Sequence, residues 1–85
     1  MKNIEIYTTS LCGFCVRAKR LLDLKGVSYK ELDVTLQGDQ RNEMIERSGT
    51  HMVPQIFING NHIGGSDDLA ALEQSGELDR LLSID

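Results

Sequence analysis

The order of a strand, an amphipathic helix and a second strand in residues 1–34 restricts the fold more than any other feature of this sequence. Residues 2–8 alternate between β-favouring and polar side chains, as a half-buried strand does. Residues 13–25 repeat small and apolar side chains at spacings of three and four, which is typical of a helix, and Gly26 can end it. Residues 27–34 again favour a strand. This order predicts two parallel strands joined by a right-handed crossover.

A second helix and a hairpin are predicted in the middle of the chain. The helix is expected over residues 39–48, capped by its first residue, an aspartate, and ended by Gly49. Residues 53–58 are apolar and favour a strand, and Asn59-Gly60 is a strong signal for a tight hairpin turn. Residues 61–63 are then the antiparallel return strand.

The last part of the chain predicts helices. After Gly64-Gly65, either Ser66 or Asp67 is expected to cap a third helix that Gly76 ends, and the leucines that follow fit one short helical turn. The chain is therefore expected to form one α/β domain over residues 1–85, with a small four-stranded mixed sheet flanked by helices in the order β-α-β-α-β-β-α.

Composition argues against several classes of protein. The 85 residues have a formal net charge of −4, without the basic excess that nucleic-acid binding requires. The longest apolar run, residues 69–72, is far shorter than the roughly 20 residues that span a bilayer. Glu5 interrupts the amino-terminal stretch before the apolar part of a signal sequence can form. We therefore expect a soluble cytoplasmic protein with no nucleic-acid or membrane partner.

Two cysteines, Cys12 and Cys15, lie between the first predicted strand and the first predicted helix, with Gly13-Phe14 between them. The unpaired backbone N–H groups and the dipole at a helix amino terminus stabilise an anion, so they favour the thiolate form of a cysteine. The thiolate is the nucleophile in thiol–disulfide exchange. This placement therefore predicts a reversible, redox-active dithiol, and the cationic side chains of Arg17, Lys19 and Arg20 add positive charge near it.

Two other interpretations of the cysteines are weaker. Buried, inert cysteines seldom occur as a pair at a turn between a strand and a helix. A zinc site needs further ligands, and the only histidines, His51 and His62, fit no common zinc-binding spacing with the cysteines. No metal site is therefore expected, and both histidines are expected to be without chemistry.

Further segments fit one known family in order and spacing. They are residues 4–8, 17–19, 26–27, 43–45, 47–49, 53–58 and 62–69, which include Val53-Pro54-Gln55-Ile56-Phe57-Ile58 and Gly64-Gly65-Ser66-Asp67-Asp68. With the dithiol, they make the chain similar to the glutaredoxins over essentially its full length, and close to the small bacterial dithiol members. The resemblance implies a thioredoxin fold and a glutathione-dependent thiol–disulfide oxidoreductase. Glutathione, glutathionylated proteins and disulfide substrates are then the expected partners.

The resemblance also implies roles for individual residues. Cys12 would be the attacking cysteine and Cys15 the resolving one. The positions expected to bind glutathione are Met52, Val53, Pro54, Gly65, Ser66, Asp67 and Arg41. Among them, the backbone of Val53 would pair with the cysteinyl part of glutathione, Pro54 would be a cis-proline facing the dithiol, and residues 65–67 would hold the γ-glutamyl end. Without the resemblance, an ordinary capped helix is the favoured interpretation of residues 65–67, although a helix amino terminus can also bind a carboxylate.

The chain departs from the family pattern near the dithiol. Thr9 stands where the family commonly has a lysine that binds the glycine carboxylate of glutathione. Arg41 is the candidate substitute, with a solvated charge on a helix as an equally good interpretation. Gly13 and Phe14 replace the usual proline and tyrosine, and Met52 replaces a threonine.

A cluster-binding role is the alternative function. Some glutaredoxins hold a 2Fe–2S cluster between two subunits, with the first cysteine of each subunit and two glutathione molecules as ligands, so that Cys12 would be the ligand here. Gly13 favours this role because a loop without the rigid proline accommodates a cluster more easily. Cys15 weighs against a protein that only carries clusters. We expect a monomer, or a dimer if a cluster is bound.

Overall fold

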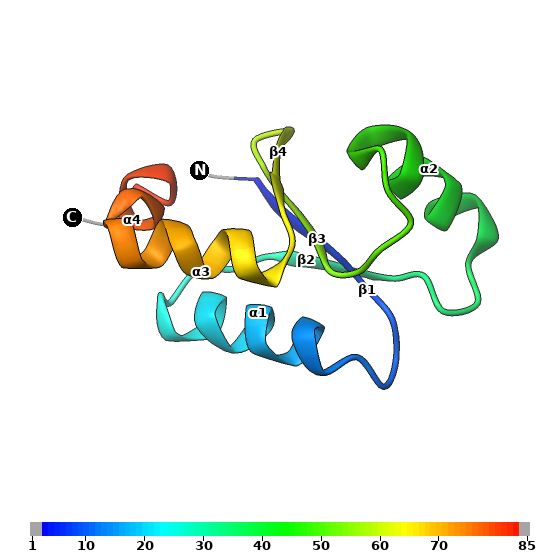
Figure 1. Ribbon diagram of the computed structural model, residues 1–85, viewed down its shortest axis with the longest axis horizontal. Helices are drawn as coiled ribbons and strands as arrows, with labels where there is room; N and C mark the ends of the chain where they lie inside the picture. Colours follow the sequence, from blue (N-terminus) through cyan, green and yellow to red (C-terminus); the bar gives the residue numbers. More distant parts are fainter. Residues whose placement is uncertain (1–2, 84–85) are drawn as a thin grey trace.

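The computed structural model describes residues 3–83. In chain order its elements are β1 (Ile4–Thr8), α1 (Gly13–Leu24), β2 (Lys30–Asp33), α2 (Gly38–Ser48), β3 (Gln55–Ile58), β4 (Asn61–Gly64), α3 (Ser66–Ser75) and the short α4 (Glu77–Leu81) (Figure 1). None of the helices within residues 3–83 combines the length and the apolar character needed to cross a membrane.

The four strands form one mixed sheet in the order β2-β1-β3-β4. β1 and β2 are parallel, with Tyr7 opposite Leu32, which confirms the predicted strand–helix–strand crossover. β3 runs antiparallel to both β1 and β4, and the turn between β3 and β4 falls at Asn59-Gly60 as predicted. The sheet therefore has the architecture that the sequence predicts.

Helices cover both faces of the sheet, and each face has its own apolar core. On one face, α1, α3 and α4 pack on the isoleucines of β1 and β3, with Leu22 and Leu69 fully buried. On the other face, Met44 of α2 packs on Tyr7 and Phe57. Side chains alternate between the faces of a strand, so neighbours such as Ile56 and Phe57 belong to different cores. In Figure 1, α1 and α3 lie side by side, while α2 lies apart from them.

Three predicted strands are shorter than the sequence suggested. The first begins at Ile4 instead of residue 2, and residue 2 lies outside the described residues. The second strand begins at Lys30, because residues 27–29 pack Val27 and Tyr29 on the core without joining the sheet. The third strand begins at Gln55 instead of residue 53, since Pro54 has no N–H group to donate to the ladder of backbone hydrogen bonds.

The predicted caps of two helices are wrong, although the helices are present. The helix α2 begins at Gly38 with Gln37 as its N-cap, so Asp39 lies inside the first turn and makes no capping hydrogen bond. The helix α3 has Gly65 as its N-cap, one residue before Ser66, because the Asp68 carboxylate accepts a hydrogen bond from the Gly65 N–H at 2.9 Å. The helix ends at Gly76 as predicted, where a φ of 82° suits a glycine.

Candidate active site

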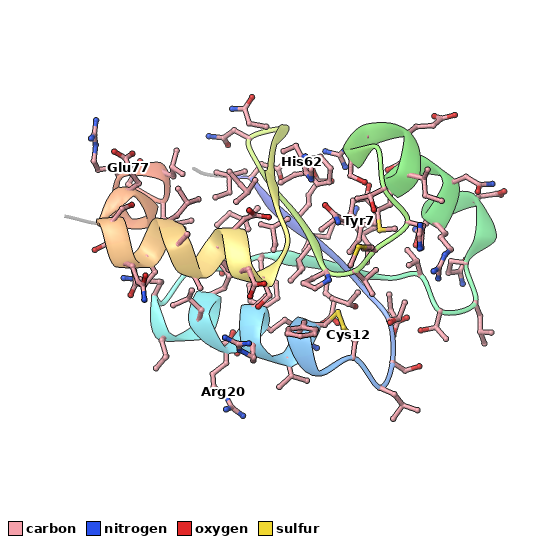
Figure 2. All side chains as sticks on the ribbon, viewed as in Figure 1. Tyr7, Cys12, Arg20, His62 and Glu77 are labelled. Atoms are coloured by element: carbon pink, nitrogen blue, oxygen red, sulfur yellow. A yellow bond between two sulfur atoms is a disulfide. The ribbon has the colours of Figure 1, made fainter. Side chains whose placement is uncertain are left out.

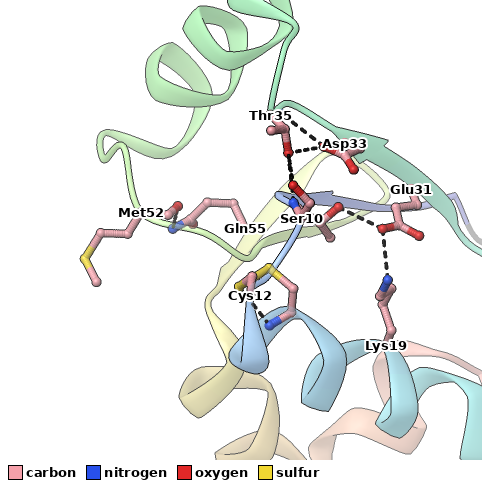
Figure 3. Close-up of a disulfide and its surroundings, with 10 residues drawn as sticks. Ser10, Cys12, Lys19, Glu31, Asp33, Thr35, Met52 and Gln55 are labelled. Atoms are coloured by element: carbon pink, nitrogen blue, oxygen red, sulfur yellow. Dashed lines mark hydrogen bonds and ion pairs between the residues drawn. A yellow bond between two sulfur atoms is a disulfide. The ribbon is translucent and has the colours of Figure 1, made fainter.

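The two cysteines lie at the amino terminus of α1 and are joined by a disulfide, with their Cα atoms 5.2 Å apart (Figure 3). Cys12 is the N-cap, and its Sγ accepts a hydrogen bond from the Cys15 N–H at 3.1 Å. Cys12 is half-buried, whereas Cys15 is only 1% exposed and faces the core. A reagent from solution can therefore reach Cys12 more readily than Cys15.

Hydrogen bonds fix the loop that leads into the dithiol. At the end of β1, the Thr8 hydroxyl donates to Glu31 Oε2 at 2.8 Å. Two residues on, the Ser10 N–H donates to Thr35 Oγ1 at 2.8 Å. Hydrogen bonds from the Thr35 side chain and backbone hold the pKa of the Asp33 carboxyl below its ordinary value. The hydrogen bonds of Thr8 and Ser10 therefore tie the end of β1 and the loop after it to β2 and the residues that follow β2 (Figure 3).

Two of the basic side chains after the dithiol have partners other than the cysteines. Lys19 Nζ lies 3.0 Å from Glu31 Oε2, so the charge of this lysine is offset by a carboxylate on the neighbouring strand. The Arg17 guanidinium lies over the Phe14 ring, 5.9 Å from its centroid. The amino terminus of α1, of which Cys12 is the N-cap, favours a negative charge on the Cys12 sulfur.

A shallow groove of about 220 Å³ adjoins the dithiol. Its lining residues are Phe14, Met52, Val53, Pro54, Ser66 and Asp67. The Val53–Pro54 peptide bond is cis, as the resemblance implied. Neither the N–H nor the carbonyl of Val53 has a hydrogen-bond partner within residues 3–83. The groove therefore offers a free backbone donor and acceptor next to Cys12.

The amino terminus of α3 forms the other wall of the groove. Ser66 and Asp67 are the first two residues of this helix, and the N–H groups of a first turn have no partner within the helix. The turn before it approaches the Pro54 loop closely, since a Cβ on Gly65 would lie 3.4 Å from the Pro54 carbonyl oxygen. The two walls together can hold an anionic, peptide-like molecule beside the dithiol.

The comparisons with known proteins agree with this geometry. A model of the glutaredoxin family matches residues 4–63. The chain belongs to the glutaredoxin family. It is 56% identical over 82 residues to glutaredoxin 3 of Escherichia coli K12, covering 96% of this chain and 99% of that protein, and 47% identical to a glutaredoxin of Pseudomonas aeruginosa, covering 98% and 99%.

Solved structures of the family have the same fold. A buckwheat glutaredoxin–glutathione complex superimposes with a TM-score of 0.87 at 28% identity, covering 96% of this chain and 77% of that one. A glutaredoxin from Brucella melitensis gives 0.84 at 49% identity, covering 96% and 89%. The predicted thioredoxin fold is therefore confirmed, and the chain is an enzyme, a glutathione-dependent thiol–disulfide oxidoreductase.

The structure brings most of the expected glutathione-binding positions together, but Arg41 is separate. Arg41 lies in the first turn of α2, half-buried, and does not line the groove. Its guanidinium makes no hydrogen bond or ion pair within the described part of the chain. Thr9, in the position of the family lysine, is half-buried in the loop before the dithiol. No group of three or more His, Cys, Asp or Glu side chains that could hold a metal converges within residues 3–83.

Two residues near the groove were not assigned a role from the sequence. Gln55, at the start of β3, is buried, and its Nε2 donates to the Met52 carbonyl oxygen at 2.9 Å. His62 lies on β4, the predicted return strand, and its Nε2 lies 2.6 Å from Gln55 Oε1 while its ring packs on Phe57. His51 is an exposed loop residue, as expected. No local pattern signals the Gln55–His62 contact, because it depends on the pairing of β3 with β4.

A polar cluster around Arg47 holds α2 on the face of the sheet that carries Tyr7 and Phe57. Arg47 donates to the Tyr7 hydroxyl at 2.7 Å and to Glu5 at 3.0 Å, and its guanidinium lies 3.9 Å from the centroid of the Phe57 ring. The Tyr7 hydroxyl in turn donates to Glu43 at 2.7 Å. Figure 2 shows Tyr7 between the sheet and α2. Burial, and then the hydrogen bond to Glu43, raise the pKa of the Tyr7 phenol.

Proposed function

We propose that the chain reduces glutathione mixed disulfides and protein disulfides through its Cys12–Cys15 dithiol. The observation that carries this proposal is the half-buried Cys12 at the amino terminus of α1, beside a groove with a free backbone donor and acceptor at Val53. The amino terminus of α1 favours the thiolate of Cys12. Since a reduced dithiol is the acting form, and thiols stay reduced in the cytoplasm, we propose that the protein works there.

In the first step, the Cys12 thiolate attacks the glutathione sulfur of a mixed disulfide. The new bond joins Cys12 to glutathione, and the substrate leaves as a thiolate that takes up a proton. A second glutathione thiolate can then attack the bound glutathione sulfur, which releases oxidised glutathione and restores the Cys12 thiolate. Alternatively, Cys15 attacks Cys12 and releases reduced glutathione, and two glutathione molecules later reduce the resulting disulfide.

The groove supplies a binding site for the glutathione part of the substrate. The N–H and carbonyl of Val53 would pair with the cysteinyl peptide group, as an added strand does. The N–H groups at the start of α3 would bind the γ-glutamyl carboxylate, and the Asp67 carboxylate its ammonium. A buckwheat glutaredoxin of the same fold is known in a complex with glutathione, which supports extending this ligand to the present chain. Arg41 stays the proposed partner of the glycine carboxylate.

Turnover of a glutathionylated peptide, with glutathione and its reductase recycling the product, tests the proposal. Cys12→Ser is expected to abolish turnover because it removes the nucleophile. Cys15→Ser is the matched control, and it is expected to retain the route that uses only glutathione. A Cys12→Ser variant that kept most of the wild-type rate would contradict the assignment. Without turnover in the wild type, a brown dimer after purification without air would support the cluster-binding alternative.

A further inference from the structure

The buried Gln55 side chain joins the strand β3 to the loop that carries Val53. Gln55 is only 4% exposed, and its amide makes a hydrogen bond at each end. The Met52 carbonyl can only accept, so the Gln55 nitrogen must face it, at 2.9 Å (Figure 3). Gln55 Oε1 then faces His62 Nε2 at 2.6 Å, and this nitrogen must carry a proton. The two contacts fix the orientation of the Gln55 amide.

His62 anchors this amide to the sheet. His62 pairs with Phe57 across β3 and β4, and the centroids of the two rings are 5.0 Å apart. Phe57 is itself 1% exposed in the core beneath α2. The Gln55 side chain is therefore held from the rigid part of the fold, and it holds the loop in turn.

The held carbonyl determines where the neighbouring N–H points. The Met52 carbonyl and the Val53 N–H belong to one planar trans peptide group, in which they point in opposite directions. Gln55 lies on the face of the sheet that α2 covers, because its neighbour Ile56 lies in the core beneath α1 and α3. The Val53 N–H therefore points away from the α2 face, toward the side on which α1 presents Cys12.

We infer that Gln55, held by His62, is a positioning residue that directs the Val53 N–H toward the cysteinyl peptide group of glutathione. The inference rests on the proposed function, since it concerns the same groove. It has a specific consequence: Gln55 matters only when the sulfur that Cys12 attacks belongs to a group with a peptide bond beside it, as in glutathione. Cysteamine forms a mixed disulfide with the same ethylene thiol linkage but has no peptide group to pair with Val53.

Single-turnover kinetics of the reduced protein test this consequence. One peptide is prepared as its mixed disulfide with glutathione and as its mixed disulfide with cysteamine, and the release of the peptide thiol is measured. Gln55→Met keeps the length of the side chain and removes both hydrogen bonds. It is expected to lower the rate constant for the glutathione substrate about tenfold, the equivalent of one well-oriented hydrogen bond, and to leave the cysteamine rate unchanged. His62→Phe keeps the ring on Phe57 and is expected to have a smaller effect of the same kind.

A destabilised control separates positioning from general loss of structure. Asn59→Ala removes the hydrogen bond from the Asn3 N–H at the far end of β3 and places alanine at a φ of 53°, so it weakens the sheet away from the groove. It is expected to lower the unfolding midpoint without changing the preference for glutathione over cysteamine. If Gln55→Met lowered the rate constants for both substrates by the same factor, or changed neither of them, the inference would be overturned. A wild type with no preference would instead contradict the proposed glutathione site.

Discussion

At the scale of single residues, similar side chains that lie close together in the sequence have different exposure and different partners. Cys12 and Cys15 are one helical turn apart, yet one caps the helix and is half-buried while the other is 1% exposed in the core. Lys19 and Arg17 both follow the dithiol, but Lys19 pairs with Glu31 while the Arg17 guanidinium lies over the Phe14 ring. Reactivity and charge therefore depend on the partners that the fold supplies.

The environment of Tyr7 is expected to make the stability of the fold depend on pH. Burial is the main cause of its raised pKa, so the folded state favours the neutral phenol, whereas the unfolded chain ionises near the ordinary value of 10.0. The stabilisation is complete below that value and is lost as the pH rises through the folded pKa. Between about pH 9 and pH 11, the free energy of unfolding is expected to fall more steeply in the wild type than in Tyr7→Phe. Urea unfolding at several pH values measures this, and parallel curves for the two proteins would contradict it.

At the scale of elements, α2 buries fewer side chains against the sheet than α1, which buries Cys15, Ala18 and Leu22. Met44 is its one fully buried residue, and the Arg47 cluster supplies much of the remaining contact with β1 and β3. This cluster combines an ion pair, a hydrogen bond and a guanidinium stacked on an aromatic ring, all partly removed from water. Such a pair is worth more than an exposed one, because water screens it less.

Arg47→Met is therefore expected to destabilise the fold by about 1–3 kcal/mol, since it leaves Glu5 half-buried without its partner. Arg80→Met is the matched control. It removes an arginine that pairs with Glu77 on the surface, with the arginine side chain 78% exposed, and is expected to change stability by less than about 0.5 kcal/mol. Urea unfolding of both variants measures the difference. Equal effects would show that the Arg47 cluster contributes no more than a surface ion pair.

The same elements show what the sequence could and could not predict. The parallel pair of β1 and β2, the hairpin at Asn59-Gly60 and the helix end at Gly76 follow from patterns within short segments, and all were predicted. The caps of α2 and α3 were missed because several adjacent polar residues can cap a helix, and side-chain contacts such as that of Asp68 decide between them. The Gln55–His62 contact joins residues on two strands, so no pattern within either strand predicts it.

At the scale of the whole molecule, one sheet serves two cores. β1 contributes Ile6 to the core beneath α1 and α3 and Tyr7 to the core beneath α2, and β3 does the same with Ile56 and Phe57. At the carboxyl end of α1, Lys25 Nζ lies 2.6 Å from Glu73 and 2.7 Å from Asp79. These ion pairs tie the end of α1 to α3 and α4. Because both cores rest on the same two central strands, loss of packing on one face weakens the strands that support the other core.

A single unfolding transition is therefore expected even when one core is weakened. Met44→Ala and Leu69→Ala each truncate a fully buried side chain, one in each core, and each is expected to cost about 2–5 kcal/mol. The chain has only two tyrosines, so in a Tyr29→Phe background fluorescence reports Tyr7, next to α2, while far-ultraviolet circular dichroism reports all the helices. The two signals are expected to coincide across the urea transition in both variants. If fluorescence changed at lower urea than circular dichroism in Met44→Ala, α2 and its core would form a separate unfolding unit, and the shared sheet would not couple the two faces.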